Sequence, residues 1–163
     1  MARKNNLAVT QRFDRELYEK SDKLAKDVVG KHLTNRGFDV RYEPVLGKVD
    51  IYAMHQSSGD KKYAEVEIKY SWKDTWNENW KDVRIPYRKK KLIDHYTEKD
   101  PYGQSCLEFY VLNHDATQAW VIPADTITKY ADVVEVSNKY VRKGEQFYSI
   151  PVDKIYTIKF NGG

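Results

Sequence analysis

The sequence predicts an α/β (α+β) fold with a mixed central sheet that has helices on its faces. Three observations favour this class. A long amphipathic segment comes first, short runs of β-branched and aromatic residues follow, and a second helical segment separates the middle runs from the later ones. An order of helix, strands, helix, strands is typical of a mixed sheet packed between helices.

The chain begins with a predicted helix over residues 11–36. Its apolar residues recur at helical spacings: Phe13, Leu17, Leu24, Val28 and Leu33. Gly37 follows directly and can take the positive φ that often ends a helix. We therefore expect this N-terminal helix to pack one apolar stripe on the sheet.

Strands are predicted next. Residues 38–54 form one strand, or two strands with an interruption at Pro44 or Gly47. Tyr63–Tyr70 forms another strand, and the polar segment 55–62 between them predicts a turn. The two sides of this turn are expected to pair.

The later part of the chain alternates helix and strand again. The tryptophan-rich segment 71–84 predicts a loop with a helical turn, and a proline starts a helix over about 86–96. The other predicted elements are a turn at 100–103, strands at 107–112 and 119–122, a short helix at 125–130, a hairpin of 133–141 with 146–152, and a last strand at 155–160. No repeat or linker interrupts the sequence. We expect one domain over 1–163, with a core at about 11–122 and a strand-rich C-terminal β-hairpin extension at about 123–163.

Composition excludes several classes of protein. A chain of 163 residues fits a single domain and can bury a core without cross-links. The single cysteine, Cys106, excludes an internal disulfide and a thiolate-clustered zinc or iron–sulfur site. No apolar run is long enough for a transmembrane helix, and the first residues lack the apolar block of a secretory signal. We expect a cytoplasmic protein of a bacterial or phage-infected cell, with no membrane contact.

The positive charge is concentrated in one segment. The net charge is +4, yet residues 69–91 hold eight basic and three acidic residues, a local +5 that leaves −1 for the rest. Tryptophans lie between these charges, a pattern that suits a polyanionic partner such as DNA. The candidate contacts to nucleic acid are Lys73, Arg84, Arg88, Lys89, Lys90 and Lys91. A solvated basic helix face is the alternative interpretation.

The tryptophans allow two interpretations as well. Trp72, Trp76 and Trp80 could stack on unpaired bases. Large aromatic residues serve more often as core or loop anchors. We favour that role for at least two of the three.

The strongest chemical signal is a set of carboxylates around the predicted turn. A hairpin centred on Ser58-Gly59 would make three apolar cross-strand pairs: Val49 with Ile68, Ile51 with Val66, and Ala53 with Ala64. The same register predicts Asp50 opposite Glu67, with Cβ atoms roughly 4.5–5.5 Å apart. Glu65 lies one step along the same face, and Lys69 lies two residues beyond Glu67.

Opposed carboxylates repel each other, so something must offset their charge. A divalent cation does this, and Mg²⁺ prefers one or two protein carboxylates with waters and substrate phosphates. Lys69 would then lie beside a metal-bound water. The alternative is an exposed hairpin with one apolar and one charged face.

Asp50, a hairpin, and then Glu67-Ile68-Lys69 resemble the motif of the PD-(D/E)XK nuclease superfamily, which includes restriction enzymes and Holliday-junction resolvases. The resemblance implies a restriction-endonuclease-like core of helix, three-stranded meander, helix and strand. Val49 stands where the superfamily has its proline. This variation leaves the charged residues of the motif in place.

The resemblance also implies roles. Asp50 and Glu67, with the main-chain carbonyl of Ile68, would bind Mg²⁺ or Mn²⁺, and Lys69 would orient or help deprotonate the attacking water. The superfamily's accessory acid on the first helix would be Asp22, with Glu16 and Glu19 as alternatives. Glu65 has no set role in the superfamily and would be a further accessory acid that holds a metal-bound water or a second ion.

We therefore expect an Mg²⁺-dependent deoxyribonuclease, an endonuclease of phage or repair and recombination type. A homodimer would allow both strands to be cut. The alternatives are a non-catalytic nucleic-acid-binding protein that keeps a nuclease-like fold, and an RNA-directed nuclease. Intact Asp50, Glu67 and Lys69 favour catalysis, because a protein that only binds a polyanion has no need of opposed carboxylates beside it.

Overall fold

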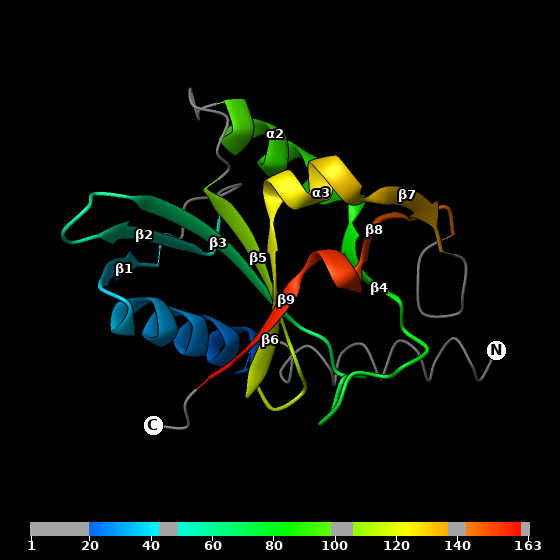
Figure 1. Ribbon diagram of the computed structural model, residues 1–163, viewed down its shortest axis with the longest axis horizontal. Coiled ribbons are helices and arrows are strands. Elements are labelled where there is room, and N and C mark those ends of the chain that lie inside the picture. The colour runs from blue at the N-terminus through cyan, green and yellow to red at the C-terminus, as the bar shows by residue number, and fades with distance from the viewer. Residues whose placement is uncertain (1–19, 43–48, 99–105, 137–142, 161–163) are drawn as a thin grey trace.

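The computed structural model of the protein describes residues 20–42, 49–98, 106–136 and 143–160, and a six-stranded mixed sheet forms its centre (Figure 1). The strands of this sheet are β1 (Phe38–Arg41), β2 (Ile51–His55), β3 (Lys61–Ile68), β5 (Leu107–Leu112), β6 (Gln118–Pro123) and β9 (Tyr156–Lys159), in the spatial order β1-β2-β3-β5-β6-β9. β3 and β5 run parallel, and the other neighbours are antiparallel. The predicted mixed α/β class is confirmed.

A second, antiparallel sheet lies beside the first. Its strands are β4 (Asp82–Pro86), β8 (Gln146–Pro151) and β7 (Asp132–Glu135), in the order β4-β8-β7. The predicted C-terminal hairpin is β7 with β8, and β9 returns to the central sheet. β4 is a correction, because the sequence predicted a loop over 71–84. Its two buried residues, Val83 and Ile85, are too few to signal a strand without their partner β8.

Helices cover both faces of the central sheet (Figure 1). The N-terminal helix, described over 20–35, lies on one face, and α2 (Lys90–Glu98) and α3 (Ala124–Tyr130) lie on the other. The short 3₁₀ turns are η1 (Tyr87–Lys89), which joins β4 to α2, and η2 (Val152–Lys154). None of these described helices is long and apolar enough to cross a membrane.

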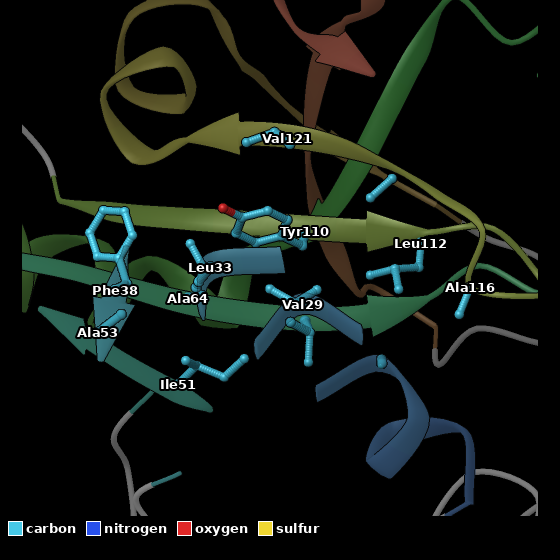
Figure 2. Packing of buried hydrophobic residues seen from close by; sticks show 13 residues of the cluster. Val29, Leu33, Phe38, Ile51, Ala53, Ala64, Tyr110, Leu112, Ala116 and Val121 are labelled. Atoms are coloured by element: carbon cyan, nitrogen blue, oxygen red, sulfur yellow. The ribbon is translucent and has the colours of Figure 1, made fainter. Parts of the chain in front are cut away.

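The N-terminal helix packs on the sheet through one stripe. Ala25, Val29 and Leu33 have no exposed surface, and Figure 2 shows the last two against sheet residues such as Ile51 and Tyr110. Gly37 ends the helix as predicted, with φ of 92°. Leu24 is exposed, so it does not belong to the stripe, and Phe13 and Leu17 lie outside the described residues.

The β2–β3 hairpin forms as predicted but in a different register. Ile51 pairs with Ala64 rather than with Val66, a shift of two residues along β3. The reason is the loop. Gly59, with φ of 74°, takes the last position of loop 56–59 instead of its centre, and the His55 N–H donates to the Asp60 carbonyl at 2.8 Å.

A shift of two residues keeps every side chain on its predicted face, because side chains alternate with a period of two. The cross-strand neighbours change. Continued past Ile51, the observed register places Asp50 level with Glu65, so the predicted pairing of Asp50 with Glu67 is wrong.

Candidate active site

The candidate site lies where β2 and β3 separate. β2 begins at Ile51, while β3 continues to Ile68. At this fork the Val66 N–H donates to Asp50 Oδ2 at 2.9 Å, so a side chain replaces the missing strand backbone. The Asp50 N–H in turn donates to Glu65 Oε2 at 3.3 Å. These two bonds hold the Asp50 and Glu65 carboxylates next to each other.

The end of β3 presents a main-chain edge to the same place. The Lys69 N–H donates to the Leu112 carbonyl of β5 at 2.8 Å. Along a strand, the N–H and C=O of one residue point to the same side, and those of the next residue point to the opposite side. The N–H and C=O of Val66 and of Ile68 therefore point away from β5. The Ile68 carbonyl therefore faces the side on which Asp50 lies, as its predicted role requires.

Each of the two carboxylates has a lysine beside it. Lys89 Nζ, from η1, lies 3.3 Å from Glu65 Oε1, and Glu65 is only 6% exposed. Lys26 Nζ, from the N-terminal helix, lies 3.6 Å from Asp50 Oδ1 and 2.8 Å from Asp22 Oδ2. Asp22 thus connects to the site through Lys26. The alternative acids Glu16 and Glu19 lie outside the described residues.

The negative charge at the fork exceeds what the lysines neutralise. Burial, a hydrogen bond shared with Asp50 and the Asp50 charge raise the pKa of Glu65 to about 8, although Lys89 acts in the opposite direction. Burial and Asp50 thus favour the protonated form of Glu65, whereas Lys89 favours its charged form. A divalent cation would also favour the charged form and displace the proton.

Glu67 lies two residues along β3 on the same face as Glu65. Its side chain is open to solvent, yet the protein around it removes enough water to raise the pKa of the carboxyl, against the charges of Lys89 and Lys69. A cavity of about 20 Å³ between β3 and the second sheet is lined by Glu65, Glu67, Lys89 and Ile85, among others. That volume holds about one water molecule.

Lys69 lies at the end of β3 under the tryptophan-rich loop. Its Nζ is 5.3 Å from the centre of the Trp80 ring, a cation–π contact. Burial lowers the pKa of Lys69, and the charge of Glu67 opposes this. The Trp72 N–H donates to the Lys69 carbonyl at 3.0 Å, so loop and lysine are tied together.

The tryptophan-rich loop is anchored from the β5–β6 turn. Asn113, buried at that turn, donates from Nδ2 to the Lys73 carbonyl at 2.8 Å. Trp72 is buried, and Trp76 Nε1 donates to the Trp80 carbonyl at 2.7 Å. The prediction that at least two tryptophans are anchors is confirmed. Asn113 was not predicted, because nothing in the sequence shows which loop it holds.

The predicted nucleic-acid contacts do not share one face. Lys89 points to the site, whereas Arg88 Nη1 lies 3.6 Å from Glu145 and Lys90 Nζ lies 2.5 Å from Asp94. The remaining candidates are exposed: Lys73, Arg84 and Lys91. Lys26 is a site residue that the sequence analysis missed. Its spacing of four from Asp22 was the available signal.

The residues at the fork fit a hard divalent cation of modest protein coordination. No group of three or more His, Cys, Asp or Glu side chains in the described ranges is placed to hold a metal ion. The carboxylates of Asp50 and Glu65 lie next to each other at the fork instead. Mg²⁺ commonly takes one or two protein carboxylates and completes its shell with waters and phosphate oxygens.

Comparisons of this chain with family models, with curated proteins and with solved structures found no match. The candidate site is therefore defined by its own geometry. Its elements are the fork at Asp50, the two glutamates of β3, the edge at Ile68, and three lysines.

Proposed function

We propose that the protein is a metal-dependent nuclease that hydrolyses DNA phosphodiester bonds, an endonuclease of phage or repair and recombination type. The observation that carries this proposal is the fork between β2 and β3. It holds the carboxylates of Asp50 and Glu65 side by side, and Glu67, Ile68 and Lys69 follow at the same end of β3.

The order of the elements supports a restriction-endonuclease-like core. A helix precedes the antiparallel strands β1, β2 and β3, and then α2 leads to β5, which is parallel to β3. The resemblance to PD-(D/E)XK nucleases implies this same order. β4 and its loop are an insertion between β3 and α2.

The residues at the fork have different roles in the proposed hydrolysis of a phosphodiester. Asp50, Glu67 and the Ile68 carbonyl would hold Mg²⁺ or Mn²⁺, which when bound polarises a phosphoryl oxygen and activates a water. Glu65 accepts the Asp50 N–H and so fixes the position of Asp50.

Lys69 is the residue that acts on the reacting groups. Its ammonium stabilises the charge that develops on the phosphate, and burial brings its pKa below the usual lysine value, which favours proton exchange with the attacking water. The Trp80 ring keeps its side chain at the end of β3.

A second candidate is a non-catalytic nucleic-acid-binding protein with this fold. The ion pairs of Lys26 with Asp50 and of Lys89 with Glu65 favour it, because a protein without a metal must neutralise its carboxylates internally. An RNA-directed nuclease would use the same residues as a DNA-directed one.

A cleavage panel tests the proposal. Duplex, nicked, branched and single-stranded DNA and single-stranded RNA are incubated with protein in Mg²⁺, Mn²⁺, Ca²⁺ or EDTA. We expect cleavage of DNA in Mg²⁺ or Mn²⁺, little in Ca²⁺, whose looser coordination positions water poorly, and none in EDTA. The matched control is Asp50→Asn purified in parallel.

The outcomes separate the candidates. Cleavage that persists in EDTA, or in Asp50→Asn, would reject the metal-dependent mechanism. Binding of DNA without cleavage under every condition would favour the non-catalytic protein, and cleavage of RNA alone would favour the RNA-directed nuclease.

A further inference from the structure

Lys89 differs from its neighbours in the basic run. Arg88 and Lys90 pair with acidic residues away from the site, whereas Lys89 extends into the cavity beside β3. There its Nζ lies 3.3 Å from Glu65 Oε1, and Glu67 lines the same cavity. The Lys89 ammonium is thus paired with Glu65 of the candidate site.

Lys26 and Lys89 are held in different ways. Lys26 lies between Asp22 and Asp50, so it keeps one partner if the other is taken. Within the described part of the chain, Lys89 forms its ion pair with Glu65. Lys89 is also carried by the single turn η1, and its long stem gives the ammonium a wide reach.

A divalent cation at the fork would compete with Lys89. It would lie at Asp50 and Glu67, and Glu65 is fixed beside Asp50 by the bond from the Asp50 N–H. Two positive groups cannot share this small cavity without strong repulsion. The cation that moves is then Lys89, because Lys26 is also held by its second partner, Asp22.

We propose that Lys89 is an exchangeable counter-ion: it neutralises Glu65 in the metal-free protein, and metal binding releases it to bind a phosphate of the nucleic acid. This inference rests on the proposed function. It makes nucleic-acid affinity depend on metal through a named residue, so that the metal-free protein holds DNA weakly and the metal-loaded protein holds it tightly.

The first test measures Mn²⁺ binding without nucleic acid. Lys89→Met removes the competing ammonium, and Lys129→Met is a control that removes the same charge from an exposed position on α3. We expect Lys89→Met to bind Mn²⁺ about fivefold more tightly than wild type, and Lys129→Met to remain within about twofold. Lys89→Arg, which keeps the charge, should behave as wild type, and thermal melting checks that each variant is folded.

The second test measures DNA affinity in EDTA, where no metal can bridge protein and phosphate. Glu65→Gln removes the partner of Lys89 and should strengthen DNA binding about fivefold and steepen the salt slope by about 0.9, one phosphate contact. In the double variant Glu65→Gln with Lys89→Met, both effects should vanish. Glu135→Gln is the control for loss of an exposed negative charge.

The outcomes distinguish this inference from the proposed function. Mn²⁺ affinity that is equal or weaker in Lys89→Met, or a Glu65→Gln effect that persists without Lys89, would overturn the exchange alone. Absence of Mn²⁺ binding in both wild type and Lys89→Met would overturn the metal site and the exchange together. Tighter Mn²⁺ binding by Lys89→Met with loss of the Glu65→Gln effect in the double variant would support it.

Discussion

The central sheet carries two buried glutamates, and they lie in contrasting surroundings. Glu108 of β5 is 7% exposed and receives the Lys62 Nζ at 2.8 Å and the Tyr110 hydroxyl at 3.1 Å. Glu65 of β3 is 6% exposed and receives the Lys89 Nζ at 3.3 Å. Burial and a lysine partner are common to both.

The difference is the second carboxylate. Asp50 lies beside Glu65 and raises its pKa, whereas Glu108 contacts a cation, Lys62, and a hydroxyl donor, Tyr110. Lys62 neutralises Glu108, whereas negative charge is in excess where Asp50 lies beside Glu65. A buried acid paired with a lysine thus serves the structure. A second acid beside such a pair makes it a candidate metal site.

The largest effect is expected at the residue that makes this difference. Asp50→Asn keeps an acceptor for the Val66 N–H and removes the excess charge. Cleavage should fall by about 10³-fold and Mn²⁺ binding should be lost, while thermal stability in EDTA should be unchanged or higher. Single-turnover cleavage and calorimetric titration with Mn²⁺ measure this. Retained Mn²⁺ binding would show that Asp50 is not a ligand.

Lys69→Ala should separate catalysis from binding at the same end of the sheet. Its ammonium acts on the reacting groups, so we expect single-turnover cleavage to fall about 100-fold or more. Mn²⁺ affinity should stay within about twofold, since Lys69 ligates no metal. Lys129→Ala provides the control for charge. A rate within about threefold of wild type would make Lys69 a surface lysine and reject the Glu-x-Lys assignment.

Local periodicity predicted most of the fold and the faces of its strands. Helical spacing predicted the N-terminal helix with Leu33 buried, although it also placed the exposed Leu24 on the apolar stripe, and the alternation along β3 follows from strand geometry. The register of the hairpin depends on where Gly59 falls in the loop, which periodicity does not specify. That single feature changed the neighbour of Asp50.

Long-range contacts account for the rest of what the sequence could not predict. β4 is a strand because β8, far along the chain, pairs with it. The sequence did not show which of the basic residues 88–91 would face the site, because that depends on how η1 and the start of α2 direct their side chains. Only the folded chain shows that Lys89 faces Glu65.

The pH dependence of stability should distinguish the two glutamates. The folded pKa of Glu65 is raised to about 8, above its unfolded value, so protonated Glu65 favours the folded state. That contribution is complete below pH 4.5 and is lost as pH rises through 8, on the order of 5 kcal/mol. Glu65→Gln should therefore be more stable than wild type at pH 8.5 and similar at pH 5, measured by urea unfolding in EDTA.

Glu108→Gln is the matched control for that experiment. It leaves Lys62 without its carboxylate, so we expect it to lower stability at neutral pH rather than raise it at high pH. If Glu65→Gln instead destabilises the protein at every pH, as Glu108→Gln would, then Glu65 has the same structural role as Glu108 and the contrast between the two glutamates fails.

The smallest expected effect compares the two lysines. Lys62→Met removes the cation from Glu108, which also contacts the Tyr110 hydroxyl. Both side chains of the Lys62–Glu108 pair are mostly buried. We expect a loss of about 1–2 kcal/mol at pH 7, less than for a fully buried pair because Lys62 is partly exposed. Lys89→Met should cost less, since Glu65, whose pKa is already near 8, can keep its proton when the ammonium is removed. Urea unfolding of both variants in EDTA gives the difference directly. A larger loss for Lys89→Met would mean that Lys89 is a fixed structural partner of Glu65, which would oppose its release by a metal.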